Sequence, residues 1–192
     1  QKTKKPEEFA EAARWYRVQL ASFPDDPEAA QVNFRLADAL FEAGQFAEAV
    51  EEYERSAYGH PLGVDSGRAG YAALNAYAKE LERLPESQRA AWKRRSIDSG
   101  VRFAQTFPEH EDSAGVLTRA TQDLYAAGDL PRAIEVAGLV LARTPPADAA
   151  QQRIAHSVIG QASFDQGDFL AAEGAWQQAR AVAVTDAAEQ KA

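Results

Sequence analysis

Apolar residues recur at spacings of three and four along most of the chain, which is the period of an amphipathic helix. One apolar stripe lies between Ala30 and Ala43, and a second follows between Phe46 and Ala57. The same pattern returns from Leu117 to Val140 and from Ile159 to Ala179. The hydrophobic pattern therefore predicts an all-α chain of successive amphipathic helices.

Recurring prolines divide these stripes. Pro24, Pro61, Pro108 and Pro145 each follow a helix-like stretch, with spacings of 37, 47 and 37 residues. Because proline cannot continue a helix, a recurring proline marks a recurring helix end. The middle interval is the longest, and here we expect two lengthened helices, at about 69–84 and 87–106.

Between the proline stops lies a second recurring mark, a glycine followed by a polar and an apolar residue. It occurs at Gly44, Gly128 and Gly167, and alanine follows five residues after each glycine. Glycine adopts the left-handed conformation that closes a helix, and the polar residue caps the next one. We expect Asp129 and Asp168 to act as such caps. Asp26, followed by Pro27, is expected to cap the first full helix.

These marks resemble the tetratricopeptide repeat (TPR), a helix–turn–helix unit of 34 residues. The matching slots hold Ala37, Gly44, Ala49, Tyr53 and Pro61 in one unit, Leu124, Gly128, Ala133 and Pro145 in another, and Gly160, Gly167, Ala172, Trp176 and Ala179 in the last. Thr121 replaces the usual small residue, and Val184 stands where the last proline is expected. The resemblance implies a right-handed α–α superhelix, a TPR-like solenoid, of about nine antiparallel helices.

The repeats predict one solenoid over residues 1–192. Its units are a half repeat at 6–24, a repeat at 27–61, a degenerate long repeat at 63–108, and repeats at 110–145 and 147–184. The opening stretch matches only the second helix of a unit, and the chain starts at Gln1 instead of methionine. We therefore expect this chain to be a fragment of a longer protein.

Composition excludes several function classes. The chain carries 21 basic and 29 acidic residues, a net charge of -8, which argues against a nucleic-acid partner. It has no cysteine, and so no thiolate metal site or cysteine nucleophile. No run of about 18 apolar residues occurs, so no transmembrane segment is expected in this piece.

Candidate catalytic chemistry is sparse. The three histidines, His60, His110 and His156, are far apart and lack the paired spacing of a metal site, and we expect them to be exposed loop residues. The glycines between Gly59 and Gly70 lack the Gly-Lys-Ser/Thr ending of a phosphate loop. We therefore assign no catalytic, cofactor-binding or metal-binding residue and expect a protein that is not an enzyme.

The TPR resemblance implies instead a protein or peptide partner on the concave face, which the first helix of each unit lines. Carried over by slot, the partner-binding residues are Phe34, Asp38, Phe41, Glu42, Thr118, Gln122, Tyr125, Gln161, Phe164 and Asp165. These slots lack the lysines and asparagines of the carboxylate-binding subtype, so a neutral or basic segment is expected. The alternative is that Phe41, Tyr125 and Phe164 simply pack between helices.

A second candidate surface is the basic patch on the long helix of the middle repeat, where an acidic partner or lipid headgroups would bind. Its residues are Arg89, Lys93, Arg94, Arg95 and Arg102. The alternative is a solvated helix face whose charges balance nearby acids.

Two Phe-Pro stops followed by an acidic residue add a further resemblance. The segments Phe23-Pro24-Asp25 and Phe107-Pro108-Glu109 are similar to TPR proteins of the bacterial envelope, of the β-barrel assembly lipoprotein and Tol–Pal partner types. This implies a scaffold in the periplasm or at the outer membrane. A cytoplasmic adaptor and a regulatory TPR segment of a larger enzyme stay open, as does the oligomeric state.

Overall fold

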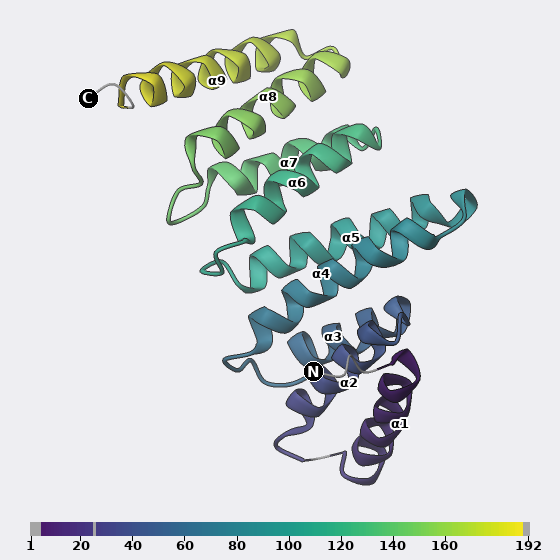
Figure 1. Cartoon of the computed structure of the whole chain (residues 1–192). Helices are drawn as coiled ribbons and strands as arrows, with labels where there is room; N and C mark the ends of the chain where they lie inside the picture. Colours follow the sequence, from purple (N-terminus) through teal and green to yellow (C-terminus); the bar gives the residue numbers. More distant parts are fainter. Residues whose placement is uncertain (1–4, 25, 190–192) are drawn as a thin grey trace. The chain divides into compact units, whose positions relative to one another are not determined.

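Every regular element of the computed structural model, which describes residues 5–24 and 26–189, is an α-helix (Figure 1). This described part contains nine helices, which confirms the all-α prediction of about nine. Their bounds are α1 (Pro6–Ser22), α2 (Ala29–Glu42), α3 (Phe46–Tyr58), α4 (Ser66–Arg83), α5 (Glu86–Thr106), α6 (Ser113–Ala126), α7 (Leu130–Leu141), α8 (Ala149–Asp165) and α9 (Phe169–Glu189).

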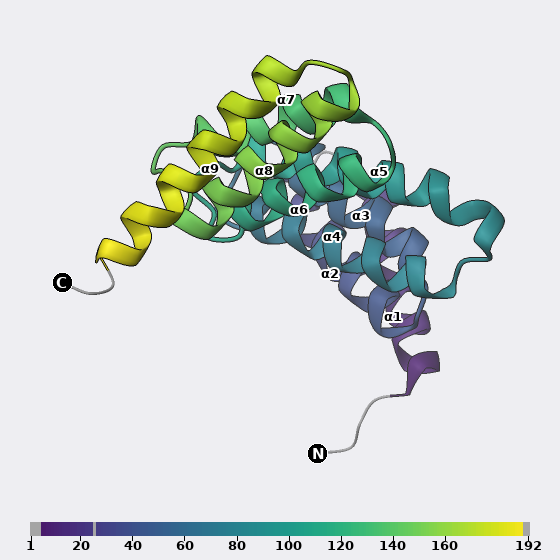
Figure 2. The same cartoon turned by 90° about the horizontal axis from the view of Figure 1, so that it is seen from above.

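The chain divides into two compact units, an N-terminal unit (Gln1–Ser96) and a C-terminal unit (Ile97–Ala192), and α5 runs through the boundary. In the N-terminal unit α1 packs on α2, α2 on α3, and α3 on α4. In the C-terminal unit α6, α7, α8 and α9 pack in the same successive way, and α6 also contacts α8 directly. Figures 1 and 2 both show α8 and α9 side by side. Each unit is thus a stack of helix pairs in chain order.

Three left-handed glycines close the first helix of a pair. Gly44, Gly128 and Gly167 have φ values of 75°, 78° and 83°, which confirms the predicted turns. At the first turn the Gly44 N–H donates to the carbonyl of Phe41 at 2.9 Å, and the Gln45 N–H donates to that of Leu40 at 2.8 Å. These bonds satisfy carbonyls that the end of the helix leaves unpaired.

Two of the three predicted aspartate caps are confirmed. The Asp129 side chain accepts from the Arg132 N–H, and Asp168 accepts from the Ala171 N–H at 3.0 Å. The prediction for Asp26 is wrong, because α2 begins three residues later, at Ala29. Asp26 instead accepts from the Glu28 N–H at 2.8 Å and fixes the turn that leads into the helix. Its neighbour Asp25 lies outside the described residues.

Alanines fill the positions where neighbouring helices touch. Ala37, Ala49 and Ala133 are fully buried, and Ala172 and Ala179 are 1% and 9% exposed. A methyl group at these positions lets two helix backbones approach closely. In the N-terminal unit, Ala37 and Ala49 share one buried cluster with Leu36, Leu40 and Val50. The repeated alanines of the sequence are therefore packing residues.

The middle repeat has longer helices, as its proline spacing predicts. The helices α4 and α5 have 18 and 21 residues, against 14 and 13 in α2 and α3. Among the described residues, no helix combines the length and the apolar character needed to cross a bilayer.

Candidate interaction surface

A groove of about 450 Å³ opens beside the first turns of α2 and α4 in the N-terminal unit. Its walls are α2, the loop 59–65 that joins α3 to α4, and the start of α4. The groove is lined by apolar residues, which are Pro27, Ala30, Phe34, Pro61 and Val64, and by charged residues, which are Glu28, Arg35, Asp38, Asp65 and Arg68. We call this feature the α2 groove.

Phe34 and Asp38, two of the predicted partner-binding residues, lie in the wall of the α2 groove and are held from behind by Tyr53 of α3. The Tyr53 hydroxyl donates to Asp38 Oδ1 at 2.6 Å, and the two aromatic rings meet edge to face with centroids 5.6 Å apart. From α4, the Arg68 guanidinium lies over the Phe34 ring at 4.8 Å. Tyr53 of α3 therefore holds both groove residues, and Arg68 of α4 adds a second contact to Phe34, before any partner binds.

The protonation of Tyr53 is also fixed. Burial, followed by the hydrogen bond to the Asp38 carboxylate, raises the pKa of Tyr53 well above its ordinary value near 10. The phenol keeps its proton at physiological pH and remains the donor to Asp38. The Asp38 carboxylate consequently faces the groove with one oxygen already engaged.

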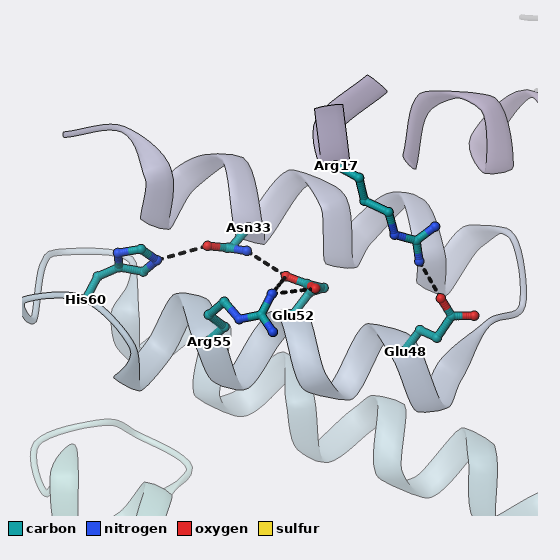
Figure 3. A network of polar contacts seen from close by, with 6 residues as sticks. All are labelled: Arg17, Asn33, Glu48, Glu52, Arg55 and His60. Atoms are coloured by element: carbon teal, nitrogen blue, oxygen red, sulfur yellow. Dashed lines mark hydrogen bonds and ion pairs between the residues drawn. The ribbon is translucent and has the colours of Figure 1, made fainter. Parts of the chain in front are cut away.

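A polar network between α2 and α3 positions the groove loop (Figure 3). Buried Asn33 donates to Glu52 at 2.6 Å, and Glu52 also accepts two bonds from Arg55, at 2.8 and 3.0 Å. On its other side the Asn33 Oδ1 lies 2.9 Å from His60 Nε2. Because His60 directly precedes Pro61, this network anchors the end of the loop that lines the groove.

A second contact in Figure 3 ties α1 to α3. Arg17 of α1 forms an ion pair with Glu48 of α3, and both side chains are about half exposed. Such exposed pairs stabilise little, so the packing of α1 on α2 mainly holds this helix in place.

The other two predicted residues of the N-terminal unit lie near the end of α2. Phe41 is half-buried and meets Phe46 edge to face at 5.0 Å, while Glu42 is exposed. The Arg83 guanidinium of α4 covers Phe46 at 4.9 Å and donates to the Gly44 carbonyl at 2.6 Å. Phe41 thus packs within the turn between α2 and α3, which agrees with the alternative that it is a packing residue and not a partner-binding one.

In the C-terminal unit, three predicted residues from two repeats form one polar cluster. The Tyr125 hydroxyl of α6 donates to Asp165 Oδ2 of α8 at 2.8 Å, and the Gln161 amide donates to Asp165 Oδ1 at 3.0 Å. The bond to Asp165 raises the pKa of Tyr125, so its phenol also stays protonated. Residues assigned from α6 and from α8 therefore lie together in this one cluster.

The remaining predicted residues of this unit differ in exposure. Thr118 is only 6% exposed and its hydroxyl donates within α6 to the Ala114 carbonyl at 2.8 Å, so it offers a partner almost no surface. Gln122 is exposed. Phe164 is 46% exposed and packs beside Phe169 and Trp176 at the turn between α8 and α9.

Two residues of the candidate basic patch, Arg89 and Arg95, are engaged by contacts within the N-terminal unit. Arg95 pairs with Glu51 at 2.7 Å and lies over the Trp92 ring at 5.0 Å. Arg89 donates to the Leu84 carbonyl at 2.9 Å and lies 3.8 Å from a Glu86 oxygen. Arg94 and Arg102 are exposed and Lys93 is half-buried. For Arg89 and Arg95 the structure therefore favours the alternative interpretation, in which these arginines balance nearby acidic side chains and carbonyls instead of binding a partner.

The predicted exposure of the three histidines is wrong, whereas the predicted loop position is confirmed for His60 and His110 and wrong for His156. All three are half-buried, and His156 lies inside α8, where burial lowers its pKa. His60 joins the Asn33 network, and the His110 ring packs on Phe103 at 5.0 Å. Nothing in the spacing of these residues shows such contacts, because each depends on a neighbouring helix. Within the described ranges, no group of three His, Cys, Asp or Glu side chains is arranged to hold a metal ion.

The sequence reasoning missed two basic residues of the α2 groove, Arg35 and Arg68. It considered only the acidic and aromatic slots, and on that basis expected a neutral or basic partner segment. Arg35 lies one residue beyond an assigned slot, and Arg68 belongs to the degenerate repeat, where no register could be assigned. With these guanidiniums present, the groove carries charges of both signs.

Comparisons with known proteins find structural similarity only. No family model and no curated protein matches the chain. Among solved structures it is similar to a crystal structure of MamA (TM-score 0.49, 19% identity, covering 94% of this chain and 92% of that one). It is also similar to MamA MSR-1 C2 (0.48, 18%, 94% and 90%) and to BtubC (BKLC) from P. vanneervenii (0.44, 18%, 93% and 74%).

Proposed function

We propose that the chain is a non-catalytic scaffold that binds a peptide or helix of a partner protein in the α2 groove. One observation carries this proposal: Arg68 lies over Phe34 in a groove where Tyr53 already holds both Phe34 and Asp38. A preorganised site loses little side-chain entropy when a partner binds. Aromatic residues and arginine are also enriched in the cores of protein–protein interfaces.

The charges of the groove define the segment that it suits. Phe34, Pro61 and Val64 offer an apolar surface, and Val64 is fully exposed. Around them stand the guanidiniums of Arg35 and Arg68 and the carboxylates of Glu28 and Asp65. We infer a partner segment with one apolar anchor and neighbouring side chains of both charges. A purely acidic segment would leave the groove carboxylates without a partner, and a purely basic segment would leave the groove arginines without one.

Site-specific photo-crosslinking in cells of the source organism tests this proposal. A photoreactive residue replaces Gln31, which is exposed in the α2 groove, and in a matched control it replaces Asn75, which is exposed on α4 outside the groove. The proposal predicts a defined crosslinked protein from position 31 that position 75 does not give. It also predicts that Arg68→Ala reduces this crosslink. Equal products from both positions would contradict the assignment of the groove.

We further propose a location in the bacterial envelope, supported only by the Phe-Pro-acidic segments that end the first and third helix stretches of the sequence. Cell fractionation with an antibody against this chain tests the location. Recovery in the periplasmic or outer-membrane fraction supports it, and recovery with cytoplasmic markers contradicts it.

A further inference from the structure

The outer face of α1 carries an exposed stripe of acidic, basic and apolar side chains. Ala12, Ala13 and Tyr16 turn toward the core of the N-terminal unit. The opposite face presents an exposed set at spacings of four, three and four, made of Glu7, Glu11, Arg14 and Val18. Trp15 lies beside it, 68% exposed, and Val18 is 56% exposed. Together with Ala10 these side chains line a shallow groove of about 590 Å³. We call this set the α1 stripe.

A second exposed stripe runs along α9. Ala172, Ala175 and Ala179 are buried on its inner side, where α9 packs on α8. The outer side presents an exposed set at spacings of three, four and three: Leu170, Glu173, Gln177 and Arg180. Leu170 is 83% exposed and its neighbour Phe169 is 63% exposed, while Gln177 donates to Glu173 at 3.1 Å. We call this set the α9 stripe.

The turn between α2 and α3 in the N-terminal unit is equivalent to the turn between α8 and α9, and it is covered by a further helix. There the Phe41–Phe46 pair is covered by α4, whose Arg83 lies over Phe46 and donates to the Gly44 carbonyl. The Phe164–Phe169 pair has the same edge-to-face arrangement, at 5.3 Å, with one ring on each side of the equivalent left-handed glycine, Gly167. Phe169, however, remains largely exposed. The exposed Phe169 is therefore the kind of surface on which another helix carrying an arginine could pack, as α4 packs on Phe46.

We propose that α1 of one copy of the chain packs antiparallel on α9 of a second copy. In this register Val18 faces Leu170, Arg14 faces Glu173, Glu11 faces Gln177, and Glu7 faces Arg180. The two sets match in length, since eleven and ten helical steps between their first and last members span about 16 and 15 Å. Both charged pairs have opposite signs, and Trp15 comes to lie near Phe169.

The parallel arrangement is excluded by the same residues. It would place Glu7 on Leu170, Glu11 on Glu173 and Val18 on Arg180, so that like charges meet and both apolar side chains face charges. Exposed ion pairs add little affinity, and here they set orientation while Trp15, Val18, Leu170 and Phe169 supply the apolar contact. The contact is small, so we expect an equilibrium in the micromolar range.

This association is head to tail, because the two contacting surfaces are different. Each copy that binds through α1 leaves its own α9 stripe available, and the complex grows until it closes into a ring or continues as a filament. The surfaces lie outside the α2 groove, so the inference stands apart from the proposed function. It predicts that several copies of the groove are displayed in one assembly.

Sedimentation velocity over a concentration series tests the inference on the full chain. The wild type should gain mass with concentration. Val18→Glu blocks the α1 stripe, Leu170→Glu blocks the α9 stripe, and each variant alone should be monomeric. An equal mixture of the two should form a heterodimer and stop there, because one intact stripe of each kind remains. Ala90→Glu, at an exposed position of α5, is the control that should associate like the wild type.

A charge reversal tests the register independently of the apolar substitutions. Arg14→Glu should weaken association about tenfold, and Glu173→Arg in the same chain should restore it. Circular dichroism of each variant confirms the helical fold. A wild type that stays monomeric at all concentrations would overturn the inference. So would a mixture of Val18→Glu and Leu170→Glu that forms no heterodimer, or a charge reversal that rescues nothing.

Discussion

The guanidinium carbon of Arg68 lies 4.8 Å from the centre of the Phe34 ring, so that α4 reaches across the α2 groove to a side chain of α2. The same Phe34 ring is held from α3 by the edge of Tyr53. Three helices therefore converge on one aromatic side chain. This convergence makes the groove a defined surface in the free protein.

Replacing Arg68 by glutamine should lower the free energy of unfolding by about 0.5–1 kcal/mol, the value of a cation–π contact at an exposed site. Arg94→Gln, at an exposed position of α5, should change it by less than about 0.5 kcal/mol. Urea unfolding followed by circular dichroism measures both. Equal effects of the two substitutions would show that the Arg68–Phe34 contact does not stabilise the unit.

Asn33→Ala should destabilise the protein by about 1–3 kcal/mol, because it removes the buried donor to Glu52 and leaves His60 without its side-chain partner. Asn75→Ala removes the same amide from an exposed position of α4 and should have almost no effect. Urea unfolding of the two variants makes the comparison. A stable Asn33→Ala protein would mean that water replaces the network that anchors the groove loop.

Tyr53→Phe should cost about 1 kcal/mol at pH 8, the value of a hydrogen bond lost from Asp38. A pH effect accompanies it. Burial raises the folded-state pKa of Tyr53 above the unfolded value near 10, so its contribution is complete below pH 10 and is lost as the pH rises further. Above pH 10, the stability of the wild type should therefore fall more steeply than that of the variant, by up to about 1.4 kcal/mol per pH unit. Parallel pH profiles of the two proteins would contradict a buried, protonated Tyr53.

Two glycines inside helices should respond to alanine with opposite signs. A Cβ at Gly160 of α8 would lie 2.4 Å from the Trp176 indole nitrogen, whereas a Cβ at Gly138 of α7 meets nothing within 4 Å. Gly160→Ala should destabilise by roughly 1–3 kcal/mol through overpacking and should shift tryptophan fluorescence. Gly138→Ala should stabilise by about 0.5–1 kcal/mol through helix propensity. If both shifted thermal unfolding in the same direction, close packing at Gly160 would be ruled out.

The sequence predicts those features that local chemistry determines. The glycine turns at Gly44, Gly128 and Gly167 follow from backbone sterics, and the buried Ala37 and Ala49 follow from the helical period. The repeat slots assign Tyr125 and Asp165 to one surface, but the hydrogen bond that joins them is not part of that prediction.

Features that depend on a neighbouring helix were beyond sequence reasoning. Arg68 lies in the repeat whose spacing departs from the others, so no slot assigns it to the groove. The contact of His60 with Asn33 joins a loop to a buried amide 27 residues earlier, and no periodicity relates the two positions. Asp26 was misplaced because a turn of three residues precedes α2, and its sequence also fits the start of a helix.

The most direct test of the central claim is the affinity of the partner segment recovered by crosslinking, measured by isothermal titration calorimetry. A synthetic peptide of that segment is titrated into the wild type, an Arg35→Ala/Arg68→Ala variant and an Arg94→Ala control. The account predicts a Kd at least about tenfold weaker for the groove variant, a loss of about 1.4 kcal/mol, and an unchanged Kd for the control. Equal affinity for all three proteins would place the binding site outside the α2 groove and contradict the account.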